Sequence, residues 1–370
     1  MRWMVGDIAD FSSNHYRTNT HPLGVLLVNP IGVLLALITG SQQVAALVFT
    51  ACLGGGFVVL LTVFLLSLGC LRRTAVLCSF LGGLSSCHLL WSAVPDYFLL
   101  DGFCLLLFCW MVTAHGKNPW LVLGSAVAAG GAVTSHFLFA VLIFIAAKHG
   151  AGRDLRNAVK DGIKFMIPVA GLLTGLAVVQ DIIYPSFTLF FHIHALQSRT
   201  MYMHDAGLAE RFAVFGPYLF LFNIVFPKIV PVPLGDSGIT GIRFCSAGPC
   251  VPYLSMGSPL VLMWGALLIW MVYVLFRTRD SIRTLGILFM LCFLLESAIH
   301  LFYGRSSEFF LYTPHWTFML PVLVGLFLTV IRRDSPRIFY LVSGYLFVFL
   351  VFLAANNIAT LMEMFRLLER

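Results

Sequence analysis

Long apolar segments, separated by short polar ones, run through almost the whole chain. A helix that crosses a bilayer needs about 20 mostly apolar residues, so each long apolar segment predicts a membrane-spanning helix. The first of them begins at Leu23, after a mostly polar start at residues 1–22. The predicted apolar segments are residues 23–39, 44–69, 74–91, 97–114, 120–147, 165–183, 257–276, 284–303, 316–331 and 337–355.

A further apolar segment, residues 212–233, differs from the others because it is rich in proline. Its prolines are Pro217, Pro227, Pro231 and Pro233. Proline removes a backbone donor and breaks helices. We therefore expect an interfacial or re-entrant segment here, rather than a helix that spans the membrane.

The basic residues indicate which loops lie on the cytoplasmic side, because cytoplasmic loops carry an excess of Lys and Arg. The most basic loops contain Arg72-Arg73, Lys117, Lys148 to Lys164, Arg277 to Arg283, and Arg332 to Arg337. All of them lie on one side only under two conditions. Segment 23–39 must stay at the outer surface without crossing. Segment 120–147 must form two short helices that meet near His136 on the outer side.

These conditions predict an all-α fold, a polytopic transmembrane helix bundle of about ten crossings. A single domain would cover residues 1–355, with an outer loop at 1–22, a juxtamembrane helix at 23–39 and a long outer loop at 184–256. Residues 356–370 would form a C-terminal tail. The chain starts outside with no preceding helix, so we also expect that a first transmembrane helix is missing.

The composition agrees with a membrane protein and excludes several other classes. Of the 370 residues, 59% are hydrophobic and 11% are charged, whereas soluble domains contain about 25% charged residues. Soluble enzymes, disordered chains and secreted disulfide scaffolds are therefore excluded. The net charge of +7 comes from short loops between apolar segments, and we expect no nucleic-acid partner.

Two of the nine cysteines lie apart from the apolar segments. Cys245 and Cys250 belong to the long outer loop, where a disulfide bond would form if the loop faces an oxidising compartment. Free thiols are the alternative. The other cysteines lie in or beside apolar segments, as small buried residues do.

The acidic residues are few, so the position of each is informative. Asp101 and Glu296 lie inside apolar segments, where an ionisable group is costly. Each marks a functional site, or is a protonated carboxyl, or pairs with a neighbouring helix. Other carboxylates gather with histidine, arginine and tyrosine on the predicted outer side. These outer residues are Asp7, Asp10, His15, Arg17, His21, Asp96, Arg305, Glu308, Tyr312 and His315. A transporter places its ionisable groups near the midplane, so this distribution favours a site at the membrane surface.

Several short motifs follow one another in a defined order. An acidic residue in the first outer loop precedes His21-Pro22-Leu23, and Leu71-Arg72-Arg73 ends a helix. A Pro95-Asp96 corner and paired short helices around Thr134 to His136 come next. Over most of residues 1–335, this order resembles the GT-C glycosyltransferases, especially the protein O-mannosyltransferase and aminoarabinose-transferase branch. The resemblance implies an integral-membrane enzyme that moves a sugar from a polyprenyl-phosphate carrier to an outer-face acceptor.

The resemblance also implies roles for individual residues. Asp7 or Asp10 matches the family's first-loop acidic residue and would be the general base that deprotonates the acceptor hydroxyl. A base in a segment before Met1 is the alternative. The implied substrate-binding residues are His15, Arg17, His21, Asp96, Arg305, Glu308, Tyr312 and His315. A divalent metal ion could also stabilise the departing phosphate, although the spacing selects no particular ion.

The implied compartment is a bacterial inner membrane with the site on the periplasmic side. The acceptor could be a glycan, a lipid or a protein. Two other functions remain open. A transporter of a lipid-linked or small solute would line its pathway with Asp101 and Glu296, although we find no internal repeat. A non-catalytic assembly protein would use its outer loops as contact surfaces.

Overall fold

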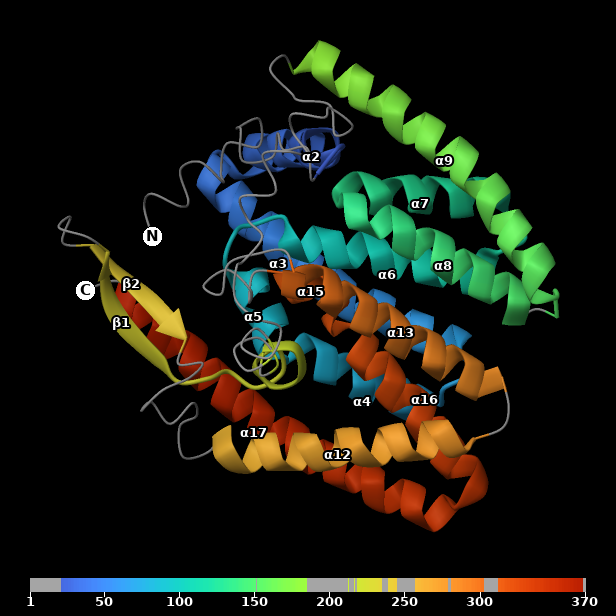
Figure 1. Cartoon of the computed structure of the whole chain (residues 1–370). Helices are drawn as coiled ribbons and strands as arrows, with labels where there is room; N and C mark the ends of the chain where they lie inside the picture. Colours follow the sequence, from blue (N-terminus) through green and yellow to red (C-terminus); the bar gives the residue numbers. More distant parts are fainter. Residues whose placement is uncertain are drawn as a thin grey trace.

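Helices dominate the computed structural model of the chain (Figure 1). The structure describes residues 21–150, 152–184, 212, 216, 218–234, 239–244, 257–278, 281–302 and 312–368. In these residues, seven helices are long and apolar enough to cross a membrane, or eight if one bent pair counts as a single span. The predicted helical class is confirmed, and the long apolar helices indicate an integral membrane protein.

The helices follow the apolar segments of the sequence. They are α2 (Gly24–Thr39), α3 (Gln42–Ser67), α4 (Arg72–Gly83), α5 (Ser86–Ala93), α6 (Phe98–His115), α7 (Pro119–Ala132), α8 (Thr134–Gly150), α9 (Leu155–Ile183), α12 (Gly257–Arg277), α13 (Ser281–Phe302), α15 (Pro314–Thr317), α16 (Met319–Asp334) and α17 (Pro336–Leu368). Tyr218–Phe222 form a π-helical turn. Strand β1 (Ile229–Leu234) pairs antiparallel with β2 (Ile239–Phe244).

Side-chain oxygens fix where several of these helices begin. Such a cap satisfies a backbone N–H that has no partner within the helix. Ser41 accepts from the N–H of Val44 at the start of α3, and Ser85 accepts from the N–H of His88 at the start of α5. Asp154 caps α9, and its bond from the N–H of Asn157 lowers the pKa of the Asp154 carboxyl.

Helix α16 forms the centre of the bundle. The span Pro314–Asp334 contains α15 and α16, and 94% of its most apolar 18-residue stretch is buried. The buried share of the corresponding stretch is 22% in α9 and 28% in α12. Figure 1 shows α9 and α12 at opposite edges, with α6 and α16 between them. The outer helices expose large apolar side chains such as Ile167 and Ile269, as lipid-facing helices do.

The predicted division of segment 120–147 into two helices is confirmed. Helix α7 ends at Ala132, and Val133 takes an extended conformation before α8 begins at Thr134. The two helices then pack side by side (Figure 1). The N–H of Leu23 donates to the carbonyl of Gly131 at 2.8 Å, so the start of α2 is attached to this corner.

Other predicted boundaries need correction. Segment 74–91 is not one straight helix, because α4 and α5 meet at an angle of 63°, where Ser85 starts a new helix. Helix α9 begins at Leu155, ahead of the predicted segment 165–183. The last helix continues without a break to Leu368, so residues 356–368, which we set apart as a tail, extend α17.

The proline-rich segment forms no spanning helix in its described part. Instead, its residues 218–226 are mostly buried and are held by Asn357 of α17. The Asn357 amide accepts from the N–H of Phe226 at 2.9 Å and donates to the carbonyls of Ile224 and Leu84, at 2.7 and 2.8 Å. One buried amide therefore joins α17, this segment and the α4–α5 bend.

Strands β1 and β2 form a hairpin, and it is the one sheet that the described residues contain. Its two strands have six residues each, and β1 contains Pro231 and Pro233. Each strand of a two-stranded sheet has a free edge, where proline is tolerated. The hairpin packs against the C-terminal part of α17 (Figure 1).

We predict that Asn357→Leu destabilises the protein. Leucine removes all three hydrogen bonds. The Ile224 carbonyl still accepts from the N–H of Ser86 at 3.0 Å, whereas the loss of a partner by another buried group costs about 1–3 kcal/mol. The midpoint of thermal unfolding in detergent should therefore fall clearly. Gln43→Ala, on an exposed position of α3, is the control and should shift stability by at most about 0.5 kcal/mol. Equal midpoints for the two variants would contradict the role of Asn357.

Candidate functional site

Five ionisable side chains from different segments meet inside the bundle, and we call them the buried charge cluster. They are His21, which precedes α2, Asp101 of α6, His136 of α8, Glu296 of α13 and His315 of α15. Each of the five is at most 6% exposed. Such burial of ionisable groups in a membrane protein marks a candidate functional site.

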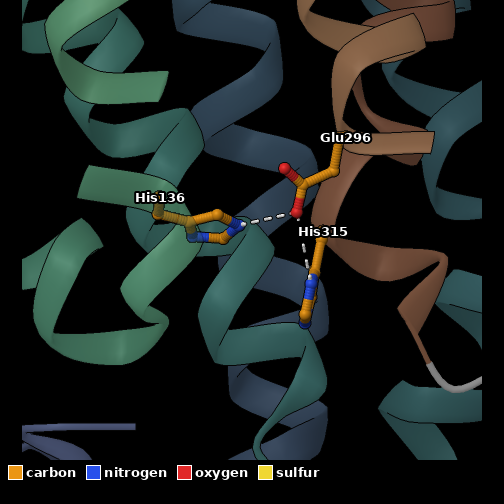
Figure 2. Close-up of side chains that lie close together, drawn as sticks. All are labelled: His136, Glu296 and His315. Atoms are coloured by element: carbon orange, nitrogen blue, oxygen red, sulfur yellow. Dashed lines mark ion pairs between the residues drawn. The ribbon is translucent and has the colours of Figure 1, made fainter. Parts of the chain in front are cut away.

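His315 lies between the two carboxylates of the cluster. Its Nε2 is 3.1 Å from Oδ2 of Asp101, and its Nδ1 is 3.7 Å from Oε1 of Glu296. The same Glu296 oxygen lies 3.9 Å from Nε2 of His136 and accepts a hydrogen bond from Ser135 at 3.3 Å. Figure 2 shows both histidine rings directed at this single oxygen.

His21 closes the other side of the cluster. Its Nδ1 lies 2.6 Å from the carbonyl oxygen of Ala132 and 3.8 Å from Oδ2 of Asp101. A carbonyl only accepts, so Nδ1 of His21 carries a hydrogen. Its ring also contacts Tyr97 edge-on, with 4.0 Å between the ring centres.

The cluster lies at one end of the bundle, because its residues come from helix ends. Asp101, His136 and His315 lie in the first turns of α6, α8 and α15, and Glu296 lies near the end of α13. At the opposite end of α6, the side chains are basic: His115, Lys117 and Lys148 line a cavity of about 840 Å³.

A glycine allows the close approach that the cluster needs. A Cβ atom on Gly102 would overlap the carbonyl oxygen of Pro314. Glycine therefore lets α6 pack directly on the backbone of α15. Its neighbour Asp101 can then reach His315.

Four of the predicted substrate-binding residues lie within the described chain. His21 and His315 belong to the cluster. Asp96 is buried at the corner before α6, where it accepts from the N–H of Tyr97 at 2.6 Å. Tyr312 is half-buried, and its ring centre lies 6.2 Å from that of His315.

The remaining predicted positions lie outside the described residues. They are Asp7, Asp10, His15, Arg17, Arg305, Glu308, Cys245 and Cys250. Their roles stay predictions.

Sequence reasoning missed how Asp101, His136 and Glu296 come together. Asp101 and Glu296 stood out as ionisable groups in apolar segments, and His136 only as a corner residue. A carboxylate buried among apolar side chains needs a polar partner, and the polar run Thr134-Ser135-His136 contains a partner of Glu296. The need for such partners was the signal by which the sequence could have indicated the cluster.

Part of the cluster has the composition of a metal site. His136, Glu296 and His315 each offer one ligand atom, and these atoms all lie within 4.8 Å of one another. Imidazole nitrogen and carboxylate oxygen are both common ligands of divalent ions.

Comparisons of the chain with protein-family models, curated proteins and solved structures find no match. The function is therefore argued from the site itself.

We predict that Gly102→Ala lowers the midpoint of thermal unfolding. The added methyl group forces α6 away from Pro314, and such overpacking costs about 1–3 kcal/mol. Gly265→Ala on α12 is the matched control, because its Cβ meets nothing within 4 Å. That change should be neutral or stabilise by up to about 1 kcal/mol. A Gly102→Ala protein as stable as the control would show that the close contact is not required.

Proposed function

We propose that the protein is a membrane glycosyltransferase that moves a sugar from a polyprenyl-phosphate carrier to an acceptor at the outer face of the membrane. The observation that carries this proposal is the meeting of helix ends in the buried charge cluster. The loop charges assign the corner at residues 92–96, the His136 corner and segment 304–315 to the outer side. The helices that begin or end at these three segments converge on the cluster.

The two lines of argument are independent of each other. The assignment of sides uses the distribution of Lys and Arg along the chain, whereas the cluster is defined by distances between side chains. Their agreement supports one polar site at one end of the bundle. It also supports ten crossings, an outer loop at 184–256 and, in a bacterial inner membrane, a site that faces the periplasm.

Sugar transfer needs a base for the acceptor hydroxyl and positive charge for the departing phosphate. The proposed base is Asp7 or Asp10, in the predicted outer loop 1–22, which also contains His21, a member of the cluster. Arg17 and Arg305 are the proposed phosphate partners. Asp96 and Tyr312, beside the cluster, are proposed to contact substrate.

An apolar cavity supports the lipid part of the proposal. A cavity of about 310 Å³ between α12, α13 and α16 is lined by apolar side chains, Phe293 and Leu320 among them. Phe293 and Glu296 are three residues apart on α13, so they lie on neighbouring parts of its surface. A hydrocarbon chain in this cavity would therefore approach the cluster.

A transporter of a lipid-linked or small solute is the second candidate. The observation that favours it is the burial of Asp101 and Glu296 in apolar helices, since buried carboxylates often line transport pathways. If the protein is a transporter, solute uptake would depend on both carboxylates. If it is the proposed glycosyltransferase, the two carboxylates hold the histidines of the cluster in position.

The test is consumption of a lipid-linked sugar in membranes that contain the chain. Asp7→Asn and Asp10→Asn are compared with the unchanged chain at equal protein levels. Loss of the general base should slow transfer by about 10²–10⁴-fold in one of the two variants. Asp334→Asn is the control, because Asp334 is exposed and lies 2.9 Å from Nε of its neighbour Arg333 at the end of α16; its rate should not change.

The outcomes distinguish a wrongly assigned base from a wrongly proposed function. If both variants keep full activity, the base is misassigned and the enzyme class stands. If no lipid-linked sugar is consumed across a panel of donors, the glycosyltransferase proposal is rejected. Uptake of a solute that requires Asp101 would then favour the transporter.

A further inference from the structure

We propose that the buried charge cluster is a metal centre, in which Nε2 of His136, Nδ1 of His315 and one oxygen of Glu296 bind a single zinc ion. This inference concerns binding. It holds or fails independently of sugar transfer.

The distances between the three ligand atoms suit a metal ion. Nε2 of His136 and Nδ1 of His315 lie 3.9 and 3.7 Å from Oε1 of Glu296, and all three atoms lie within 4.8 Å of one another. Tetrahedral zinc with bonds of about 2.0–2.2 Å holds neighbouring ligand atoms about 3.4 Å apart. Small side-chain rotations therefore bring these atoms to ligand positions.

Asp101 provides the outer support that metal-bound histidines use. A metal-ligating histidine donates its second N–H to a carboxylate or carbonyl, which fixes its tautomer and orientation. Nε2 of His315 lies 3.1 Å from Oδ2 of Asp101. When Nε2 donates there, Nδ1 presents its lone pair towards Glu296. A cation between this nitrogen and the carboxylate oxygen is attracted to both.

The charges of the cluster also favour a divalent cation. Asp101 and Glu296 bring two negative charges to positions that are at most 1% exposed. Charge buried in this way is costly unless it is compensated. One divalent ion, with neutral imidazoles, balances the two carboxylates.

The ligand types favour zinc over magnesium and calcium. Magnesium and calcium prefer shells made of oxygen, whereas two imidazoles and one carboxylate suit zinc, with a fourth position left for water or a substrate oxygen. The ion would join α8, α13 and α15, and would link His136 to Glu296 and His315, which lie far along the chain from it (Figure 2).

The test measures metal in the purified full-length chain. The protein is isolated in detergent without metal-affinity resin, equilibrated with zinc and a weak chelator, and analysed for all metals by mass spectrometry. We expect one zinc ion per chain. His136→Gln and Glu296→Gln should lose the ion, and Asp101→Asn should bind it about 10–100-fold more weakly.

His88→Gln is the matched control. His88 is also a buried histidine, its Nε2 lies 3.1 Å from the carbonyl oxygen of Gly54, and it does not belong to the group of three proposed ligands. This variant should keep the ion. Zinc content that falls equally in His88→Gln and His136→Gln would overturn the proposal, as would an unchanged chain that binds no zinc or binds iron in its place.

A measurement on the unchanged chain covers the case in which the variants do not fold. X-ray absorption at the zinc edge should show imidazole nitrogens at about 2.0–2.1 Å and no sulfur. A shell that contains sulfur, or oxygen alone, would overturn the proposal.

Discussion

A carboxyl group buried among apolar helices is stable only when a partner compensates its charge. Asp101 and Glu296 share His315, which faces one with each ring nitrogen, and the proposed zinc ion would balance their charge. Since these residues come from α6, α13 and α15, the requirement fixes how three helix ends lie relative to one another. Gly102 removes the side chain that would keep α6 and α15 apart. His136 extends the arrangement to α8.

Hydropathy predicted much of the helical framework, because the length of an apolar segment sets the length of a spanning helix. Hydropathy gave wrong boundaries where hydrogen bonds to other segments, and not apolar side chains, hold a helix in place. The polar pair Asn356-Asn357 looks like the end of a helix, yet both amides are buried, and Asn357 bonds to backbone groups of other segments. Helix α17 therefore continues. The bend at Ser85 was equally hidden, because a hydroxyl cap leaves little trace in an average hydropathy.

The members of the cluster were visible in the sequence, but their pairing was not. Asp101 and Glu296 stood out because charge is rare in apolar segments. The partners of these carboxylates, His315 for Asp101 and His136 for Glu296, lie more than 150 residues away in the chain. Helix packing alone brings them together, and no local pattern encodes it. Reasoning from outer loops also favoured residues near the surface over buried ones.

The length of α17 determines where the hairpin stands relative to the lipid. A helix of 33 residues is about 50 Å long, whereas the hydrocarbon layer is about 30 Å thick. The open edges of a two-stranded sheet need hydrogen bonds that lipid tails do not provide. If α17 crosses the bilayer from its first turns, the hairpin packed against its C-terminal part would stand in the aqueous layer, where a water-soluble molecule could touch it without entering the bilayer.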